Sequence, residues 1–295
     1  MAFFNENQTI FIFTGKGGVG KSVVAAAWAQ KKAREGVKTL LVELGNQSYY
    51  QYVYGQKIDY LPTVISKNFS ISLWSGELCL REYVLHLIKV KKIVDLFFDN
   101  RVMRTFIRAA PALKELAILG KVTSGIRGWG PPLEYDIIVV DAFSTGHLMA
   151  LLRAPIGMGE MIQAGPMGEQ SRKIIEVLKN KKLCEYFIVT LPEELPVSET
   201  EELSCSLIDT VGQSSRIICN RVYPQPLPSN ELATIINSEI SEGACSYASY
   251  LKGVYERESE QLERLKKIAP SFTTLPLLFT AEGRKVVDGL EGELT

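Results

Sequence analysis

Residues 14–22 of the 295-residue chain read Thr-Gly-Lys-Gly-Gly-Val-Gly-Lys-Ser. The residues before them, 9–14, are mostly apolar and rich in β-branched and aromatic side chains, which is typical of a buried parallel strand. The residues after them, 23–35, have a helix-forming composition and stop at Gly36, a residue type that commonly ends a helix. A strand, a glycine-rich loop and a helix in this order are the context of a phosphate-binding loop. The sequence therefore predicts that this loop binds a nucleotide.

The loop combines residues that shape its backbone with residues that contribute a side chain. Glycines let backbone N–H groups converge on phosphate oxygens at the positive end of a helix dipole. We expect the Lys21 ammonium to contact the β- and γ-phosphates and the Ser22 hydroxyl to bind Mg²⁺. The expected nucleotide contacts of this segment are Gly15, Gly17, Gly18, Val19, Gly20, Lys21, Ser22 and Val23.

The composition restricts the class of protein. Basic and acidic residues balance at 33 each, so nothing favours a nucleic acid as the main partner. No apolar run approaches the roughly 20 residues that span a bilayer, and the first residues lack the layout of a signal peptide. We therefore expect a cytoplasmic protein without stable membrane insertion. The five cysteines are scattered without a C-x-x-C pair, which favours buried apolar roles over disulfides or zinc ligands.

Strand-like segments alternate with helical segments along most of the chain. This alternation predicts an α/β fold with a doubly wound, mostly parallel sheet, in which ligands bind beyond the carboxyl ends of the strands. No internal repeat or long flexible linker divides the sequence, so we expect one P-loop domain over residues 1–295. The predicted strands are 9–14, 38–43, 68–74, 136–141, 186–191, 216–220 and 272–276.

Residues 77–127 interrupt the alternation, because they contain no strand signal. They read as a helical subdomain of two or three helices, at about 81–98, 101–110 and 111–122, the last beginning at Pro111. Apolar residues recur there at helical spacing. Either these stripes pack on each other and on the sheet, or they form a surface for a client helix or a partner subunit. The stripe residues are Leu85, Ile88, Ile93, Leu96, Phe97, Met103, Phe106 and Ile107.

A second chemical motif follows the fourth predicted strand. Residues 135–141 read Tyr-Asp-Ile-Ile-Val-Val-Asp, an apolar strand that ends in a carboxylate. An aspartate in this place commonly holds Mg²⁺, often through a water molecule, so we expect this role for Asp141. Gly146 lies shortly after it and would let the backbone approach or move at the γ-phosphate. His147 is either a switch residue or a structural histidine.

Lys16 lies inside the loop, where an ordinary phosphate-binding loop has no need of a lysine. The form G-K-G-G-V-G-K-S resembles the deviant Walker A loop of the MinD/ArsA group of P-loop ATPases. In that group the extra lysine reaches the partner's nucleotide across a dimer interface, which implies a catalytic role in trans for Lys16. The alternative is a solvated lysine without such a role.

The resemblance is specific to the ArsA family, which includes the ATPases of arsenite pumps and of tail-anchored protein targeting. Residues 141–155 are similar to its D-x-x-x-T-G-H-x-x-x-L-L-x-x-P segment, and residues 188–200 look like its P-E-x-x-P-x-x-E-T block. Residues 275–283 resemble the final strand and the loop over the base. Residues 108–121 are similar to the helical insert of bacterial members, so the resemblance covers nearly the whole chain.

The resemblance implies an ATPase that binds ATP or ADP with Mg²⁺. Asn220 matches the position where relatives place an asparagine against adenine, and Pro276 lies in the loop region that closes over the base. A carboxamide can pair with both the N6 donor and the N7 acceptor of adenine. The implied partners are a second copy of the chain or a related ATPase, and a protein client is possible. A MinD-like positioning ATPase is a further alternative. Such proteins end in a basic amphipathic membrane helix, whereas residues 291–295 are acidic, which counts against this alternative.

The segment after the second strand departs from the family pattern. Members usually have D-P-A-H-x-x-S-D there, and the last aspartate positions the attacking water. This chain has Glu43 in place of the first aspartate, and the last aspartate aligns near Tyr50. Slow hydrolysis by the chain alone is therefore expected. The alternative function is a hydrolysis-impaired regulatory subunit in a heterodimer with an active relative.

Two further features of the sequence bear on partners. The tyrosines at 49, 50, 52 and 54 form either a packed loop or a partner surface. The zinc-binding C-x-x-C of the targeting ATPases is absent.

Overall fold

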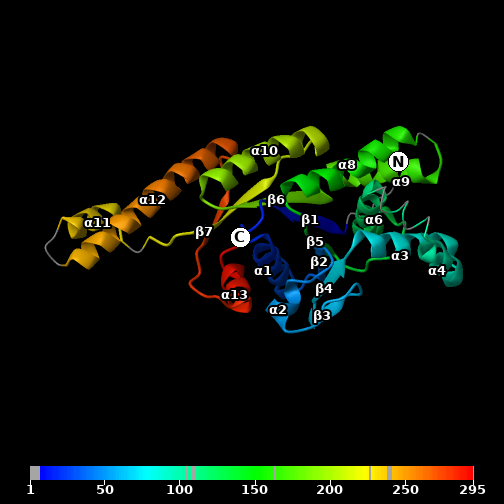
Figure 1. Ribbon diagram of the computed structural model, residues 1–295, viewed down its shortest axis with the longest axis horizontal. Coiled ribbons are helices and arrows are strands. Elements are labelled where there is room, and N and C mark those ends of the chain that lie inside the picture. Colours follow the sequence, from blue (N-terminus) through cyan, green and yellow to red (C-terminus); the bar gives the residue numbers. More distant parts are fainter. Residues whose placement is uncertain are drawn as a thin grey trace.

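The predicted α/β fold is confirmed by the computed structural model, in which eight strands form one sheet covered by helices on both faces (Figure 1). The structure describes residues 7–294 except 102, 104, 106, 108–110, 163, 226 and 238–240. The sheet order is β3-β4-β2-β5-β1-β6-β7-β8. The strands are β1 Thr9–Thr14, β2 Thr39–Leu44, β3 Thr63–Ser66, β4 Phe69–Trp74, β5 Ile137–Asp141, β6 Cys184–Thr190, β7 Arg216–Val222 and β8 Thr273–Pro276.

All neighbouring strands run parallel except the edge pair β3 and β4, which is antiparallel. The seven predicted strands are present within one or two residues of their expected bounds. β3 was not predicted, because its four residues alternate between half-buried and exposed and give no run of apolar side chains. Within the described residues no helix is both long and apolar enough to cross a membrane.

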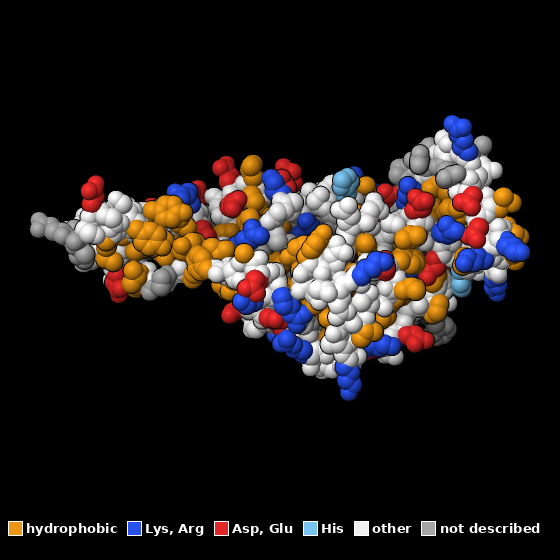
Figure 2. Space-filling view, turned by 60° about the horizontal axis from the view of Figure 1, so that its bottom comes forward, with side chains coloured by type: hydrophobic (Ala, Val, Ile, Leu, Met, Phe, Trp, Pro, Cys, Tyr) orange, Lys and Arg blue, Asp and Glu red, His pale blue; other side chains and the backbone are white. Residues whose placement is uncertain are grey.

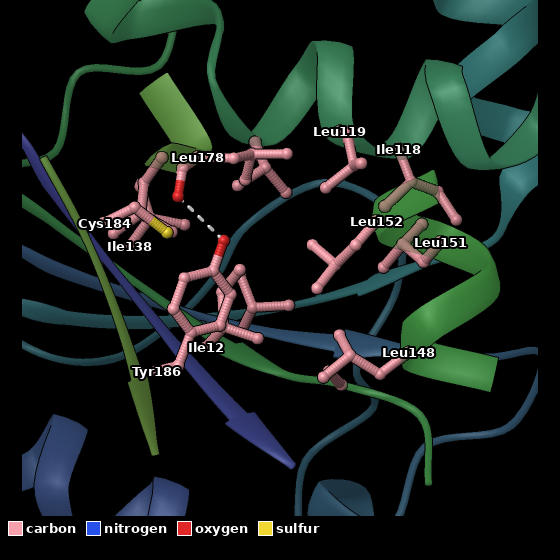
Figure 3. Close-up of a cluster of buried hydrophobic side chains, with 14 of the residues drawn as sticks. Ile12, Ile118, Leu119, Ile138, Leu148, Leu151, Leu152, Leu178, Cys184 and Tyr186 are labelled. Carbon is pink, nitrogen blue, oxygen red and sulfur yellow. Dashed lines mark hydrogen bonds between the residues drawn. The ribbon is translucent and has the colours of Figure 1, made fainter. Parts of the chain in front are cut away.

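One face of the sheet is covered by α1 Lys21–Arg34, α2 Tyr50–Tyr54 and α13 Gly283–Glu291. The opposite face is covered by α6 Pro111–Val122, α8 Thr145–Met161, α9 Pro166–Lys179 and α10 Glu194–Val211. Figure 3 shows the second of these cores, in which Ile12 and Ile138 of the sheet face Leu152 of α8. Tyr186 of β6 donates a hydrogen bond of 3.0 Å to the Leu178 carbonyl of α9, which satisfies its buried hydroxyl.

The insertion between β4 and β5 is helical as expected, but its first helix is divided. The prediction of one helix over 81–98 is wrong, because the chain forms α3 Gly76–Ile88 and then α4 Lys91–Asp99. Lys89 separates them in the left-handed region, with φ 59°. The turn brings Leu85 of α3 against a cluster that contains Phe98 of α4. Tertiary packing therefore bends a segment in which the sequence has no glycine or proline.

The rest of the predicted helical subdomain is described only in part. The helix expected at 101–110 lies partly outside the described residues. The expected helix at 111–122 is confirmed as α6, and the short α7 Ser124–Arg127 follows it. Leu85, Phe97 and Ile107 of the apolar stripes are packed, whereas Ile88, Ile93 and Leu96 are 37%, 52% and 75% exposed. The helices are thus held together by one part of each stripe and present the other part to solvent.

An arm extends from the sheet at the end of the molecule away from α3 and α4 (Figure 1). It consists of α11 Ser229–Ile236 and α12 Glu242–Ile268, which pack on each other. At a rise of 1.5 Å per residue, the 27 residues of α12 span about 40 Å. Apolar side chains gather along this arm in Figure 2, and Tyr247 and Tyr250 of α12 are exposed there.

Candidate functional site

The sheet topology brings the predicted site residues to one edge. β1 lies between β5 and β6, so the loop that follows β1 emerges between the carboxyl ends of two parallel strands. Phe13 of β1 and Glu43 of β2 are both register partners of Asp141 in β5. Acidic groups from two strands and the glycine-rich loop therefore meet where a doubly wound sheet binds its ligand.

The loop at 15–20 has the backbone that a phosphate cradle requires. Gly18 and Gly20 have φ angles of 88° and 92°, which other residue types rarely adopt. A Cβ on Gly15 would overlap the Val189 carbonyl of β6, whereas a Cβ on Gly17 or Gly18 would meet nothing within 4 Å. No side chain caps the first turn of α1. The N-terminal N–H groups of α1 therefore receive no side-chain cap, and a bound anion is favoured at such a helix end.

Lys21 is the first residue of α1, and its side chain crosses the loop. Its Nζ donates a hydrogen bond of 3.4 Å to the Lys16 carbonyl. The ammonium thus lies against the backbone of the loop, where it can act on a bound phosphate as a positive charge.

Asp141 ends β5 and is buried, with 6% of its surface exposed. Burial raises the pKa of its carboxyl, while hydrogen bonds from Ser22 and Tyr50 and the positive charge of Lys21 oppose this shift. The predicted Mg²⁺ groups Ser22 and Asp141 therefore lie next to each other, and both offer hard oxygen atoms of the kind that Mg²⁺ takes together with nucleotide phosphates. The donor set fits a magnesium ion.

Tyr50 is a site residue that the sequence analysis did not assign. It begins α2, is fully buried, and points its hydroxyl to Asp141. Its oxygen lies 3.0 Å from Asp141 Oδ2 and 3.0 Å from the Ser22 carbonyl. Burial and the nearby Asp141 raise the pKa of Tyr50 well above its usual value, so the phenol is a neutral donor. The sequence signal was that a family aspartate aligns near Tyr50, but an aromatic residue in that place did not indicate this contact.

Glu43 serves the loop between β2 and α2 rather than presenting a free carboxylate. Ser48 Oγ donates to its Oε2 at 2.5 Å, and the Tyr49 N–H donates to its Oε1 at 2.7 Å. Burial raises the pKa of Glu43, and these two hydrogen bonds oppose the shift. Both carboxylate oxygens are thus used to fold the loop back onto the end of β2, which places Tyr50 over Asp141.

A cavity of about 350 Å³ adjoins the other side of the loop. Val23, Asn220 and Pro276 are among its lining residues, so it collects three predicted nucleotide contacts from separate parts of the chain. The Asn220 amide donates to the Val19 carbonyl at 2.9 Å and is 2% exposed. A Cβ on Gly20 would overlap that amide nitrogen. Asn220 therefore supports the loop as well as facing the cavity, a contact that the sequence did not predict.

Lys16 and Gly146 lie at the outer side of the site. The Lys16 ammonium forms an ion pair of 2.6 Å with Glu199 of α10, inside one chain. Gly146 is exposed in the first turn of α8, and a Cβ there would meet nothing within 4 Å. Thr14, at the end of β1, donates its hydroxyl to the Phe143 carbonyl at 3.1 Å, which ties the segment before α8 to the start of the loop.

Comparison with known proteins places the family model and the similar proteins in one family of ATPases. Residues 8–166 match the model of the anion-transporting ATPases of the ArsA family. A candidate arsenical pump-driving ATPase of Halobacterium salinarum is 26% identical over 270 residues, which cover 85% of this chain but 40% of that protein. The ATPase BagA of Mycobacterium tuberculosis is 29% identical over 78% of this chain and 70% of its own length. The arsenical pump-driving ATPase of Escherichia coli is 23% identical over 86% of this chain and 46% of its own length.

Proposed function

This chain belongs to the ArsA family of anion-transporting ATPases, and we propose that it binds Mg-ATP between two facing subunits and converts binding and hydrolysis into movement of a helical surface. The observation that carries the proposal is the meeting of loop 15–22, Asp141 and the cavity with Asn220 at one edge of the sheet. We treat residues 1–295 as one P-loop domain with a helical subdomain at about 77–127.

In this proposal the residues of the loop hold the phosphates of ATP. Backbone N–H groups of Gly15 to Ser22 bind phosphate oxygens, and Lys21 neutralises charge on the β- and γ-phosphates. Ser22 and Asp141 hold Mg²⁺, which when bound neutralises charge on the same phosphates. Asn220 and Pro276 contact the adenine from the cavity, and Val19 and Val23 pack beside them.

Lys16 acts in trans in this proposal. When two subunits close face to face, its ammonium exchanges Glu199 for the partner's nucleotide and stabilises charge on the phosphoryl group that is transferred. Gly146 responds to the γ-phosphate, and α8 carries the response away from the site. α8 packs against α6 of the insertion, so a contact path exists from the site to the helical surface.

A client or partner site on the insertion is supported by the exposed apolar side chains of α3 and α4. Ile88, Ile93 and Leu96 lie there at the end of the molecule opposite the arm (Figure 1). Apolar side chains that remain in water at neighbouring turns are common at interaction surfaces.

A second candidate function is a regulatory subunit with impaired hydrolysis, paired with an active relative. Tyr50 favours it, because a neutral phenol lies beside Asp141 and cannot serve as a carboxylate that positions water. A related chain with an intact aspartate, purified together with this one, would support the heterodimer.

The test is calorimetric titration of Mg-ATP into the wild type, Lys21→Ala and the control Lys252→Ala, together with the rate of ATP turnover. Lys252 is half-exposed on α12, and among the described residues its ammonium is paired only with Glu256. Lys21→Ala should lose at least one charge-assisted hydrogen bond, worth roughly 1.5–3 kcal/mol, and turnover should fall with it. Lys252→Ala should match the wild type. Unchanged ATP affinity in Lys21→Ala would show that the site is wrongly assigned.

A further inference from the structure

The hydroxyl of Tyr50 contacts both residues to which we assign Mg²⁺. Its oxygen is 3.0 Å from Asp141 Oδ2 and 3.0 Å from the backbone oxygen of Ser22. A phenol carries one proton, so these two acceptors compete for a single donor. The Tyr50 side chain is fully buried. Its contacts with Asp141 and Ser22 therefore do not depend on the movement of solvent-exposed atoms.

We propose that Tyr50 is a positioning residue for Mg²⁺: its hydrogen bond to Oδ2 orients the Asp141 carboxylate so that the other oxygen faces the ion. The inference rests on the proposed function, since it takes the nucleotide site as given. A carboxylate at a strand end can rotate about its last side-chain bond, and a hydrogen bond to one oxygen fixes that rotation. Groups that orient a metal ligand in this way commonly change metal affinity by about 10- to 100-fold when they are lost.

The position of the hydroxyl is fixed from three sides. The Tyr50 ring contacts the ring of Tyr49 at 5.7 Å and that of Tyr54 at 6.4 Å between centroids. The loop before it is held by Glu43 through Ser48 and the Tyr49 N–H. Removal of the hydroxyl alone should therefore leave the ring in place and take away one of the two hydrogen bonds that hold the Asp141 carboxylate, the other coming from Ser22.

A merely structural role for Tyr50 makes a different prediction. A buried ring contributes to stability through packing, which phenylalanine would keep, and its effect on nucleotide binding would not depend on Mg²⁺. A positioning role acts only when the ion is present. The dependence of nucleotide affinity on Mg²⁺ therefore separates the two.

The experiment is calorimetric titration of ADP into the wild type, Tyr50→Phe and Tyr54→Phe, once with saturating Mg²⁺ and once with EDTA. The ratio of the two ADP affinities measures the gain due to Mg²⁺. In Tyr50→Phe this ratio should be about tenfold smaller than in the wild type, and the ADP affinity in EDTA should equal that of the wild type. Tyr54→Phe is the matched control, because its hydroxyl lies 3.4 Å from Gln30 and not at Asp141, and it should keep the full gain.

A double-mutant cycle with Asp141→Asn completes the test. If Tyr50 acts through the Asp141 carboxylate, Tyr50→Phe should change the Mg²⁺ gain much less in that background. An unchanged gain in Tyr50→Phe, an equal loss with Mg²⁺ and with EDTA, or a Tyr50→Phe chain that circular dichroism shows to be unfolded would each overturn the positioning role. A wild type that binds no ADP under either condition would instead defeat the proposed function itself.

Discussion

Lys16 and Glu199 form their ion pair with about a third of each side chain exposed. A pair of this kind contributes about 0–1 kcal/mol, since water and salt screen it. Lys16 can therefore leave Glu199 at little cost when a more strongly charged phosphate comes within reach. The family resemblance assigns Lys16 to the partner's nucleotide. Within one chain, its ion pair with Glu199 is easy to exchange for that contact.

We expect Lys16→Ala to keep most of the nucleotide affinity and to lose turnover or nucleotide-dependent dimerisation. The reason is that its proposed target belongs to the partner, so binding to one subunit does not require it. Sedimentation velocity with ADP and with a transition-state mimic measures the dimer, and an ATPase assay measures the rate. Wild-type dimerisation and wild-type turnover in this variant would contradict the role in trans.

Gly20 permits the approach of the Asn220 side chain to the loop, because a Cβ at this position would overlap the Asn220 amide nitrogen. Gly20→Ala should lower ADP affinity, because the new Cβ would displace the Asn220 amide from the Val19 carbonyl. Gly212→Ala is the matched control: its φ is also positive, at 69°, but nothing lies within 4 Å of its Cβ position. Both variants should lose about 1–2 kcal/mol in the free energy of unfolding from the left-handed backbone. Equal ADP affinity in the two variants would show that the Asn220 contact has no part in binding.

At the scale of helices and strands, the sequence predicted most of the sheet because its strands are buried on both faces and read as apolar runs. It missed β3, a short edge strand, and the break at Lys89, which depends on packing between α3 and α4. The loop and Asp141 could be predicted from motifs with fixed chemistry. The contact of Tyr50 could not, because it depends on the fold of the loop that Glu43 holds.

The insertion should respond differently to changes on its two faces. Leu96→Ala should change the free energy of unfolding by less than about 0.5 kcal/mol, because that side chain is 75% exposed. Phe98→Ala should cost about 3–5 kcal/mol within the insertion, because Phe98 is 5% exposed in the cluster that joins α3 to α4. Amide hydrogen exchange of α3 and α4 measures both effects. Equal protection in the two variants would contradict the assignment of a packed and an exposed face.

At the scale of the whole molecule, apolar side chains are exposed at both ends. Ile88, Ile93 and Leu96 lie on the insertion, and Tyr247 and Tyr250 lie on the arm. Figure 2 shows hydrophobic side chains gathered along the arm. The proposed nucleotide site lies between these ends, at the carboxyl edge of the sheet. A closed dimer would place the signature lysine of each subunit at the site of the other, so hydrolysis should depend on assembly.

The isolated chain should hydrolyse ATP slowly. The aspartate that positions water in the family pattern aligns near Tyr50 and has no evident counterpart here, and Glu43 accepts hydrogen bonds from Ser48 and the Tyr49 N–H. Each 1.36 kcal/mol of transition-state stabilisation that is lost lowers the rate about tenfold, so binding can remain while turnover is barely measurable. A steady-state ATPase assay with and without an added partner chain tests this. Fast turnover that neither Glu43→Gln nor a partner changes would contradict both slow hydrolysis and the heterodimer alternative.

The most direct test of the central claim is a crystal structure of the chain with ADP and Mg²⁺. The phosphates should lie on the backbone N–H groups of residues 15–22, with the Lys21 ammonium beside them. Mg²⁺ should lie next to the Ser22 hydroxyl on the side of Asp141, and the adenine should lie in the cavity lined by Asn220 and Pro276. A nucleotide bound elsewhere, or phosphates on this loop with the base outside that cavity, would contradict the account.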